Sequence, residues 1–187
     1  MREGPGVSRF GTAHKFFSEL FETDVARLYA GETLVVRSVR REEERGGMTT
    51  PVWILVTEGR GVVSTSRFLY RVVGAWAEAF SAPDYLLRPA YLGELQAAVS
   101  RALDAPAVVS HDRVFAPGSS FKAGPKTILQ PLPGSPPSAA ADLLARAAHD
   151  GVLPLFHCAE SDHASASGAL AAGCFECGRM ARLQVRR

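Results

Sequence analysis

The last sixty residues of the chain alternate between stretches with the spacing of a strand and stretches with the spacing of a helix. Short apolar runs at 126–129, 152–158 and 179–185 are separated by helical patterns at 138–149 and 164–172. Strands that are joined through a helix lie parallel in one sheet, because parallel strands need a crossover connection. This order predicts a mixed α/β fold with a strand–helix–strand crossover near its end.

The first part of the chain has a different order of elements. Apolar residues at helical spacing predict an amphipathic helix over residues 13–29, followed by strands at 33–39, 52–57 and 62–65. The charged run at 40–45 mixes arginines with glutamates and is typical of a solvated hairpin loop. Residues 1–60 are therefore expected to form a helix plus β-meander extension that precedes the main domain.

The main domain is expected over residues 61–187. After its first strand, apolar spacing predicts two consecutive helices, at 67–80 and 91–103. Two short strands are expected next, 107–110 and 114–116, with His111-Asp112 as the tight turn between them. Ligands of such sheets bind where the carboxyl ends of strands meet, so we expect the site near residues 128–138 and 158–165.

Composition narrows the class of protein further. The chain has 187 residues, 47% hydrophobic and 21% charged, which is typical of a globular domain and excludes a disordered tail or a repeat array. Its formal net charge of +2 is too small to make nucleic acid or an anionic membrane the expected partner. The apolar runs are far shorter than the roughly 20 residues of a membrane helix.

The location of the protein is predicted from both ends of the chain. The N-terminal segment has scattered charges and no apolar stretch of signal-peptide length, so a cytoplasmic protein is expected. All three cysteines lie within the last thirty residues, an odd number that does not fit a secreted disulfide framework.

One local motif accompanies the final crossover. Asp162-His163-Ala164-Ser165 is followed, eight residues after the serine, by Gly173-Cys174, and five residues later by Gly178. This spacing and the order of the elements resemble the GCN5-related N-acetyltransferase (GNAT) superfamily, whose members often carry Asn-x-x-Ser before a Gly-Phe. Here aspartate replaces the asparagine and cysteine replaces the phenylalanine. Ala169 occupies the position at which many members have an acid-donating tyrosine.

The resemblance implies a GNAT-like mixed central sheet flanked by helices, and an acyl-CoA-dependent N-acyltransferase. The cofactor would be acetyl-CoA or another acyl-CoA, and the acceptor an amine of a small molecule or a protein. Glu160 would be the catalytic base, beside two strands that part to admit the cofactor. The cofactor would be bound by the backbone of Ile128, Leu129 and Gln130, by the phosphate-binding groups of Gly134, Ser135, Ser138 and Ala139, and by Asp162 and Ser165. Asp162 is expected to be a helix N-cap in any case.

Two features favour a second class of function, a catalytically inactive binding or dimerisation protein on the same fold. Three of the seven residues at 132–138 are prolines, and each removes an N–H donor from the expected phosphate loop. Ala169 cannot act as an acid. A strand edge at 181–185 would suit pairing with a second copy of the chain.

Two further sites were weighed from the residue types alone. Zinc could be bound by His157, Cys158, His163, Cys174 and Cys177, since the last two have the spacing of a zinc knuckle. However, His157 and Cys158 are adjacent on an expected strand and would point to opposite faces. A catalytic dyad of His111 and Asp112 is disfavoured because neighbours in a turn point apart.

Overall fold

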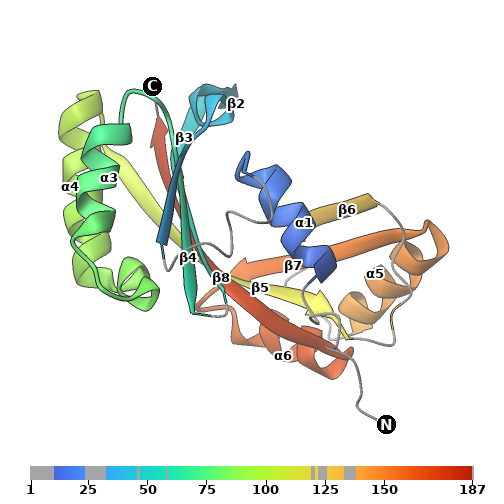
Figure 1. The fold of residues 1–187 in the computed structure, drawn as a ribbon. Coiled ribbons are helices and arrows are strands. Elements are labelled where there is room, and N and C mark those ends of the chain that lie inside the picture. The colour runs from blue at the N-terminus through green and yellow to red at the C-terminus, as the bar shows by residue number, and fades with distance from the viewer. Residues whose placement is uncertain are drawn as a thin grey trace, which may run out of the picture. The chain divides into compact units, whose positions relative to one another are not determined.

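The protein is seen in a computed structural model that describes residues 11–23, 33–45, 47–57, 59–118, 121, 126–132 and 138–186. It divides into two compact units. Unit 1 comprises residues 1–17 and 113–177, and unit 2 comprises residues 18–112 and 178–187. The described strands form a mixed sheet in the order β1-β4-β3-β8-β5-β7-β6, with β2 paired to β3 (Figure 1). The predicted α/β class is confirmed, while the GNAT-like arrangement and the boundary at residue 60 stay predictions.

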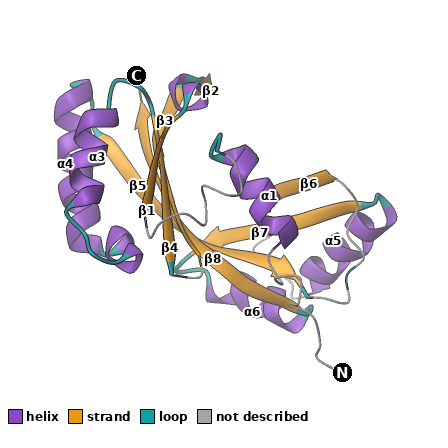
Figure 2. Ribbon diagram, viewed as in Figure 1, coloured by secondary structure: helices purple, strands orange, loops and turns teal. Residues whose placement is uncertain are grey.

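Unit 2 is a sheet with two helices on one face (Figure 2). In it β4 runs parallel to β1 and antiparallel to β3, and β3 runs antiparallel to β8. Its elements are β1 (Thr33–Arg37), η1 (Val39–Glu42), β2 (Glu44–Arg45), β3 (Met48–Thr57), β4 (Arg60–Thr65), α3 (Tyr70–Glu78), η2 (Pro83–Leu87) and α4 (Pro89–Leu103), with parts of β5 (Ala107–Pro117) and β8 (Cys174–Arg186).

The core of unit 2 follows from two periodicities. Alternate residues of β3, such as Val52 and Ile54, are fully buried on the face that carries the helices, because strand side chains alternate between faces. The helices meet that face with apolar residues three or four positions apart, among them Val73 and Ala77 of α3. Side chains between these positions on β3 therefore belong to the opposite face of the sheet.

Unit 1 contains the crossover predicted from the sequence. Its elements are β6 (Lys126–Pro131), α5 (Ser138–His149), β7 (Val152–Ala159) and α6 (His163–Ala171), together with the remaining parts of β5 and β8. Both helices pack on the same face, where Ala140 of α5 and Ala169 of α6 share a buried cluster with Phe115 and Phe156. The small residues of α6 allow this close packing.

Four predictions about elements were wrong. Helix α1 (Gly11–Leu20) ends before residue 29, and Glu22 has a left-handed φ of 53°, which a continuing helix cannot adopt. Residues 24–29 of the expected helix lie outside the described part. Strand β5 continues through His111 and Asp112 without a turn. The charged run is not a solvated loop, because it forms η1 and β2 and buries Arg41.

The fourth correction concerns the C-terminal strand. β8 is not a sheet edge, because it lies between β3 and β5, and Ala181, Leu183 and Val185 are buried in the core of unit 2. Pairing of a second copy along residues 181–185 is therefore not available. None of the described helices combines the length and the apolar character needed to span a bilayer.

Candidate functional site

The site expected for a thioester cofactor lies between β6 and β7, and the structure shows no gap there. The two parallel strands are paired in one register from Lys126 opposite Val152 to Pro131 opposite His157. Beyond the last pair, the Leu132 amide still donates to the His157 carbonyl over 2.8 Å. The expectation that these strands part is wrong, because their hydrogen bonds continue past the end of β6.

One edge of β6 is paired with β7, and the other edge points away from it. β6 is the last strand in the sheet order. The backbone N–H of Leu132 points towards β7, and backbone groups point to alternate sides along a strand. The N–H and C=O groups of Ile128 and Gln130 therefore also point towards β7. Leu129 and Pro131 direct theirs outward, and proline at such a position costs no ladder hydrogen bond. Of the three residues predicted to pair with the cofactor, only Leu129 directs its backbone groups away from β7.

Asp162 and Ser165 form a local cap at the start of α6. The Asp162 carboxylate accepts a hydrogen bond from the Ser165 amide over 3.0 Å and another from the Ser165 hydroxyl over 2.6 Å. Both hydrogen bonds favour the charged carboxylate and lower the pKa of Asp162, the one from the Ser165 hydroxyl having the larger effect. The N-cap prediction is confirmed. Ser165 is only 5% exposed and directs its hydroxyl to the cap.

Two positions bear on acid–base chemistry: Glu160, the expected base, and Ala169, at the position of the family tyrosine. Glu160 is exposed in the turn after β7, as expected from its position in the sequence. Ala169, at the position of the family tyrosine, is fully buried in the cluster beneath α6. The alanine side chain is a methyl group and cannot donate a proton to a leaving thiolate.

The three cysteines are buried, and none of them forms a disulfide bond. Burial raises the pKa of the Cys174 thiol to about 11, which keeps it protonated and unreactive. Cys158 and Cys174 belong to the apolar cluster of unit 1. In the part of the chain that the structure describes, no three His, Cys, Asp or Glu side chains come together as metal ligands. The zinc hypothesis therefore has no support there.

The His111–Asp112 pair does not form a dyad. The two residues are neighbours within β5, so their side chains point to opposite faces. The Asp112 carboxylate is buried and pairs with the Arg182 guanidinium of β8. Asp112 therefore has a structural role, which explains why the chain continues as a strand at this point.

A groove of about 430 Å³ lies beside α5, close to the predicted cofactor residues. Gln130 and Ala139, both predicted to bind the cofactor, line it. Pro131 at the end of β6 and the adjacent Leu132 form one wall. The sequence analysis missed three residues of α5 that form the other, Asp142, Leu143 and Arg146. The signal for these three was their spacing from Ala139, at three, four and seven residues, which places them on one helix face.

Three of the residues predicted to bind the cofactor are described only in part or not at all. Gly134 and Ser135 lie outside the described residues. Ser138 is the first residue of α5, and its side chain is not described. Within the described residues, the predicted cofactor set is therefore split between the groove, the β6–β7 ladder and the α6 cap.

The chain was compared with protein families, curated proteins and solved structures. No family model, curated protein or solved structure matches it. The resemblance to the acetyltransferases remains a prediction from the sequence.

Proposed function

We propose that the protein is a binding protein that takes acyl-CoA or CoA in the groove beside α5 without transferring the acyl group. The observation that carries this proposal is the continuous β6–β7 ladder, which runs from Lys126 and Val152 to Pro131 and His157. A thioester arm cannot enter between strands whose backbone groups are paired with each other. Transfer from within the sheet is thereby disfavoured, and binding on the outside of the sheet is favoured.

The groove supports binding of a mainly apolar chain that carries amide groups. Leu132 and Leu143 provide apolar surface, and Gln130 provides a side-chain amide. The outward backbone groups of Leu129 can accept and donate hydrogen bonds, as an edge strand does towards an added strand. The pantetheine arm of CoA has two amides in an extended chain, which fits such an edge.

The same groove argues against chemistry at the bound thioester. Its charged residues are one carboxylate, Asp142, and one guanidinium, Arg146. The Arg146 Nε donates to the Asp142 carbonyl over 3.4 Å. Glu160, the proposed base, does not line the groove. Among the described residues that line the groove, Asp142 is the one carboxylate that an amine acceptor would meet, and it lies on the exposed surface of α5.

Calorimetry and a transfer assay together test the proposal. Acetyl-CoA and CoA should both bind saturably and with similar affinity, because the acetyl group is not recognised by a catalytic centre. In a thiol-release assay with spermidine and a lysine peptide as acceptors, the protein should release no more CoA than buffer does. A dissociation constant of about 1 mM corresponds to a binding free energy of only about −4 kcal/mol. If neither ligand binds at about 1 mM, the proposal is overturned. Release of CoA with turnover would favour the acyltransferase instead.

A pair of tryptophan substitutions on α5 locates the binding site. Ala139→Trp fills the groove and should weaken acetyl-CoA binding at least tenfold. Ala145→Trp places the same side chain at an exposed position of the same helix that does not line the groove, and should leave binding unchanged. Equal affinities of the two variants would place the ligand elsewhere.

A further inference from the structure

A second cavity lies within unit 2, on the face of the sheet opposite α3 and α4. Trp53 of β3 belongs to this face, because its neighbours Val52 and Ile54 point into the helix-covered core. The cavity has a volume of about 270 Å³, and Trp53 lines it together with residues of η1, β3 and β8. This volume is just below the usual range for drug-sized ligands, so a smaller organic molecule would fit.

The wall of the cavity is held rigidly by Arg41. Its Nε donates to the Ser64 hydroxyl over 3.0 Å, and its Nη2 donates to the Leu20 carbonyl over 2.8 Å. The guanidinium carbon lies 4.2 Å from the centre of the Trp53 ring, in a cation–π contact. Phe21 meets the same indole edge-on at 6.4 Å. The indole is therefore fixed in place before any ligand binds.

Two neighbouring donors on this face lack an acceptor. Among the described residues, neither the buried Trp53 Nε1 nor the buried Arg182 Nε has a hydrogen-bond partner. The two residues are directly opposite each other in the β3–β8 ladder. Both groups can only donate. The other tryptophan shows the ordinary situation, because Trp76 Nε1 donates to the Tyr91 carbonyl over 3.1 Å.

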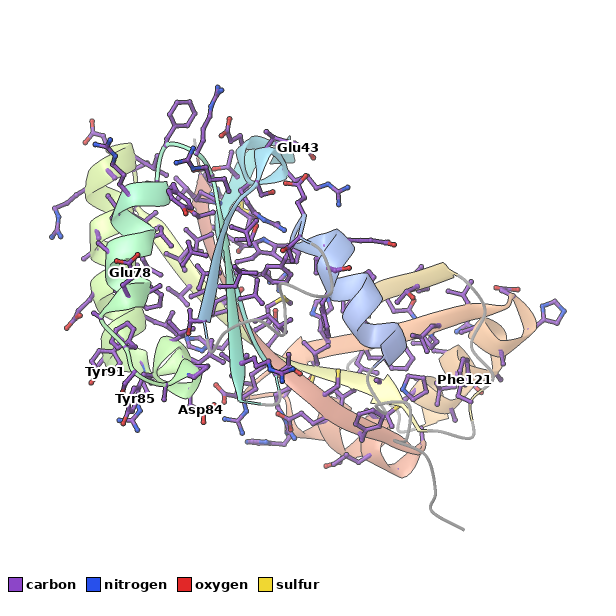
Figure 3. All side chains as sticks on the ribbon, in the orientation of Figure 1. Glu43, Glu78, Asp84, Tyr85, Tyr91 and Phe121 are labelled. Carbon is purple, nitrogen blue, oxygen red and sulfur yellow. The ribbon has the colours of Figure 1, made fainter. Side chains whose placement is uncertain are left out.

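Of these two residues only Trp53 lines the cavity, and the lining has further hydrogen-bond donors. Arg40 is held by Glu22 at 3.2 Å and by the Glu19 carbonyl at 3.3 Å, and its guanidinium keeps further N–H groups for a ligand. Gln184 adds a side-chain amide, and Met48 adds apolar surface. Glu43, the carboxylate in the lining, follows η1 at an exposed position (Figure 3) and opposes a second negative charge on the ligand.

We propose that this cavity binds a small organic monocarboxylate with an apolar body. The carboxylate lies towards the donors of Arg40, Gln184 and Trp53, and the apolar body lies against Met48 and the indole. The donors of the lining, among them the Trp53 indole and the Arg40 guanidinium, define the charge of the ligand, because an oxyanion accepts several hydrogen bonds at once and an ammonium group accepts none. The site is separate from the groove of unit 1 and does not depend on the function proposed for it.

Amide and indole spectra of ¹⁵N-labelled protein test the proposal with a matched series of probes: phenylacetate, 2-phenylethanol and phenethylamine. Trp53 and Trp76 are the two tryptophans of the chain and give two indole signals. Phenylacetate should move the Trp53 signal saturably and leave the Trp76 signal in place. The neutral alcohol should bind at least tenfold more weakly, and the amine should not bind.

Substitutions at the rim keep the fold intact and check the donors. Arg40→Met and Gln184→Met should each weaken phenylacetate binding about tenfold. Arg67→Met is the control and should change nothing, because Arg67 is also an exposed, ion-paired arginine but does not line the cavity. The proposal is overturned if phenylacetate at about 5 mM leaves the Trp53 signal unmoved, or if the alcohol or the amine binds as tightly as the acid.

Discussion

The two adjacent arginines of η1 should respond very differently to substitution. Arg41 has 5% of its surface exposed, donates hydrogen bonds to Ser64 and Leu20, and stacks on Trp53. Arg40 has 53% of its side chain exposed and forms an ion pair with Glu22. Arg41→Ala removes a buried cation together with its contacts, whereas Arg40→Ala changes only the surface.

The magnitude follows from the contacts of Arg41. Each hydrogen bond from a charged donor contributes about 1.5–3 kcal/mol, and the cation–π contact about 0.5–2 kcal/mol. The substitution also removes the desolvation cost of burying the guanidinium charge, which offsets several kcal/mol of this sum. We therefore expect Arg41→Ala to lower the free energy of unfolding by about 2–4 kcal/mol. Arg40→Ala should change it by less than about 1 kcal/mol.

Urea unfolding followed by tryptophan fluorescence measures both values, and Trp53 reports directly on the contact with Arg41. Arg41→Lys gives a second comparison, because a lysine cannot reach Ser64 and Leu20 with a planar pair of donors. It should recover only part of the lost stability. The reasoning is refuted if Arg41→Ala and Arg40→Ala unfold at the same urea concentration with the same slope.

Three further predictions concern unit 1 and the helices. Hydrogen bonds from Ser165 lower the pKa of Asp162 below its ordinary value of 3.8, so the charged cap stabilises the fold above pH 3.8 and this stabilisation is lost as the pH falls through the lowered pKa. In urea unfolding, Asp162→Asn should therefore unfold at a lower urea concentration than the wild type at neutral pH, and at the same concentration in strong acid. A stability difference that does not change with pH would contradict this. Burial raises the pKa of Cys174 to about 11, so an aromatic disulfide reagent at mildly alkaline pH should modify this thiol only after the protein is unfolded in urea. Fast modification of Cys174 in the native protein, located by mass spectrometry, would show instead that the thiol is accessible. A methyl group at Gly118 would lie 2.9 Å from the Gly173 carbonyl, so Gly118→Ala should lower the free energy of unfolding, measured by thermal unfolding, by about 1–3 kcal/mol. Gly93 lies in α4 and has nothing within 4 Å of an added methyl group, so Gly93→Ala should raise the free energy of unfolding by about 0.5–1 kcal/mol.

The secondary structure of unit 1 could be predicted from local patterns. The helix expected at 138–149 is α5 with the same bounds, and the strand expected at 152–158 differs from β7 by one residue. Apolar spacing determines these elements because each buries one face against a neighbour. The α6 cap was also predictable, since an aspartate bonds the amide three residues later.

Interactions between distant segments could not be predicted in this way. The turn expected at His111-Asp112 is a continuous strand because Asp112 pairs with Arg182, seventy residues further along the chain. The expected gap between β6 and β7 is closed because backbone pairing depends on the register of two strands, which local composition does not specify. At both places the prediction failed because it required knowledge of a partner strand, whereas the bounds of α5 and β7 depended on local spacing.

Local sequence patterns were enough to predict the α/β class, the positions of most helices and strands, and the helix cap at Asp162, because these depend on residues close to one another in the chain. Three features depend on contacts between distant segments instead: which of Arg40 and Arg41 is buried, which donors of Trp53 and Arg182 lack an acceptor, and where cavities open. The two arginines are chemically identical neighbours, and only the packing of Trp53 and Ser64 around one of them removes it from water.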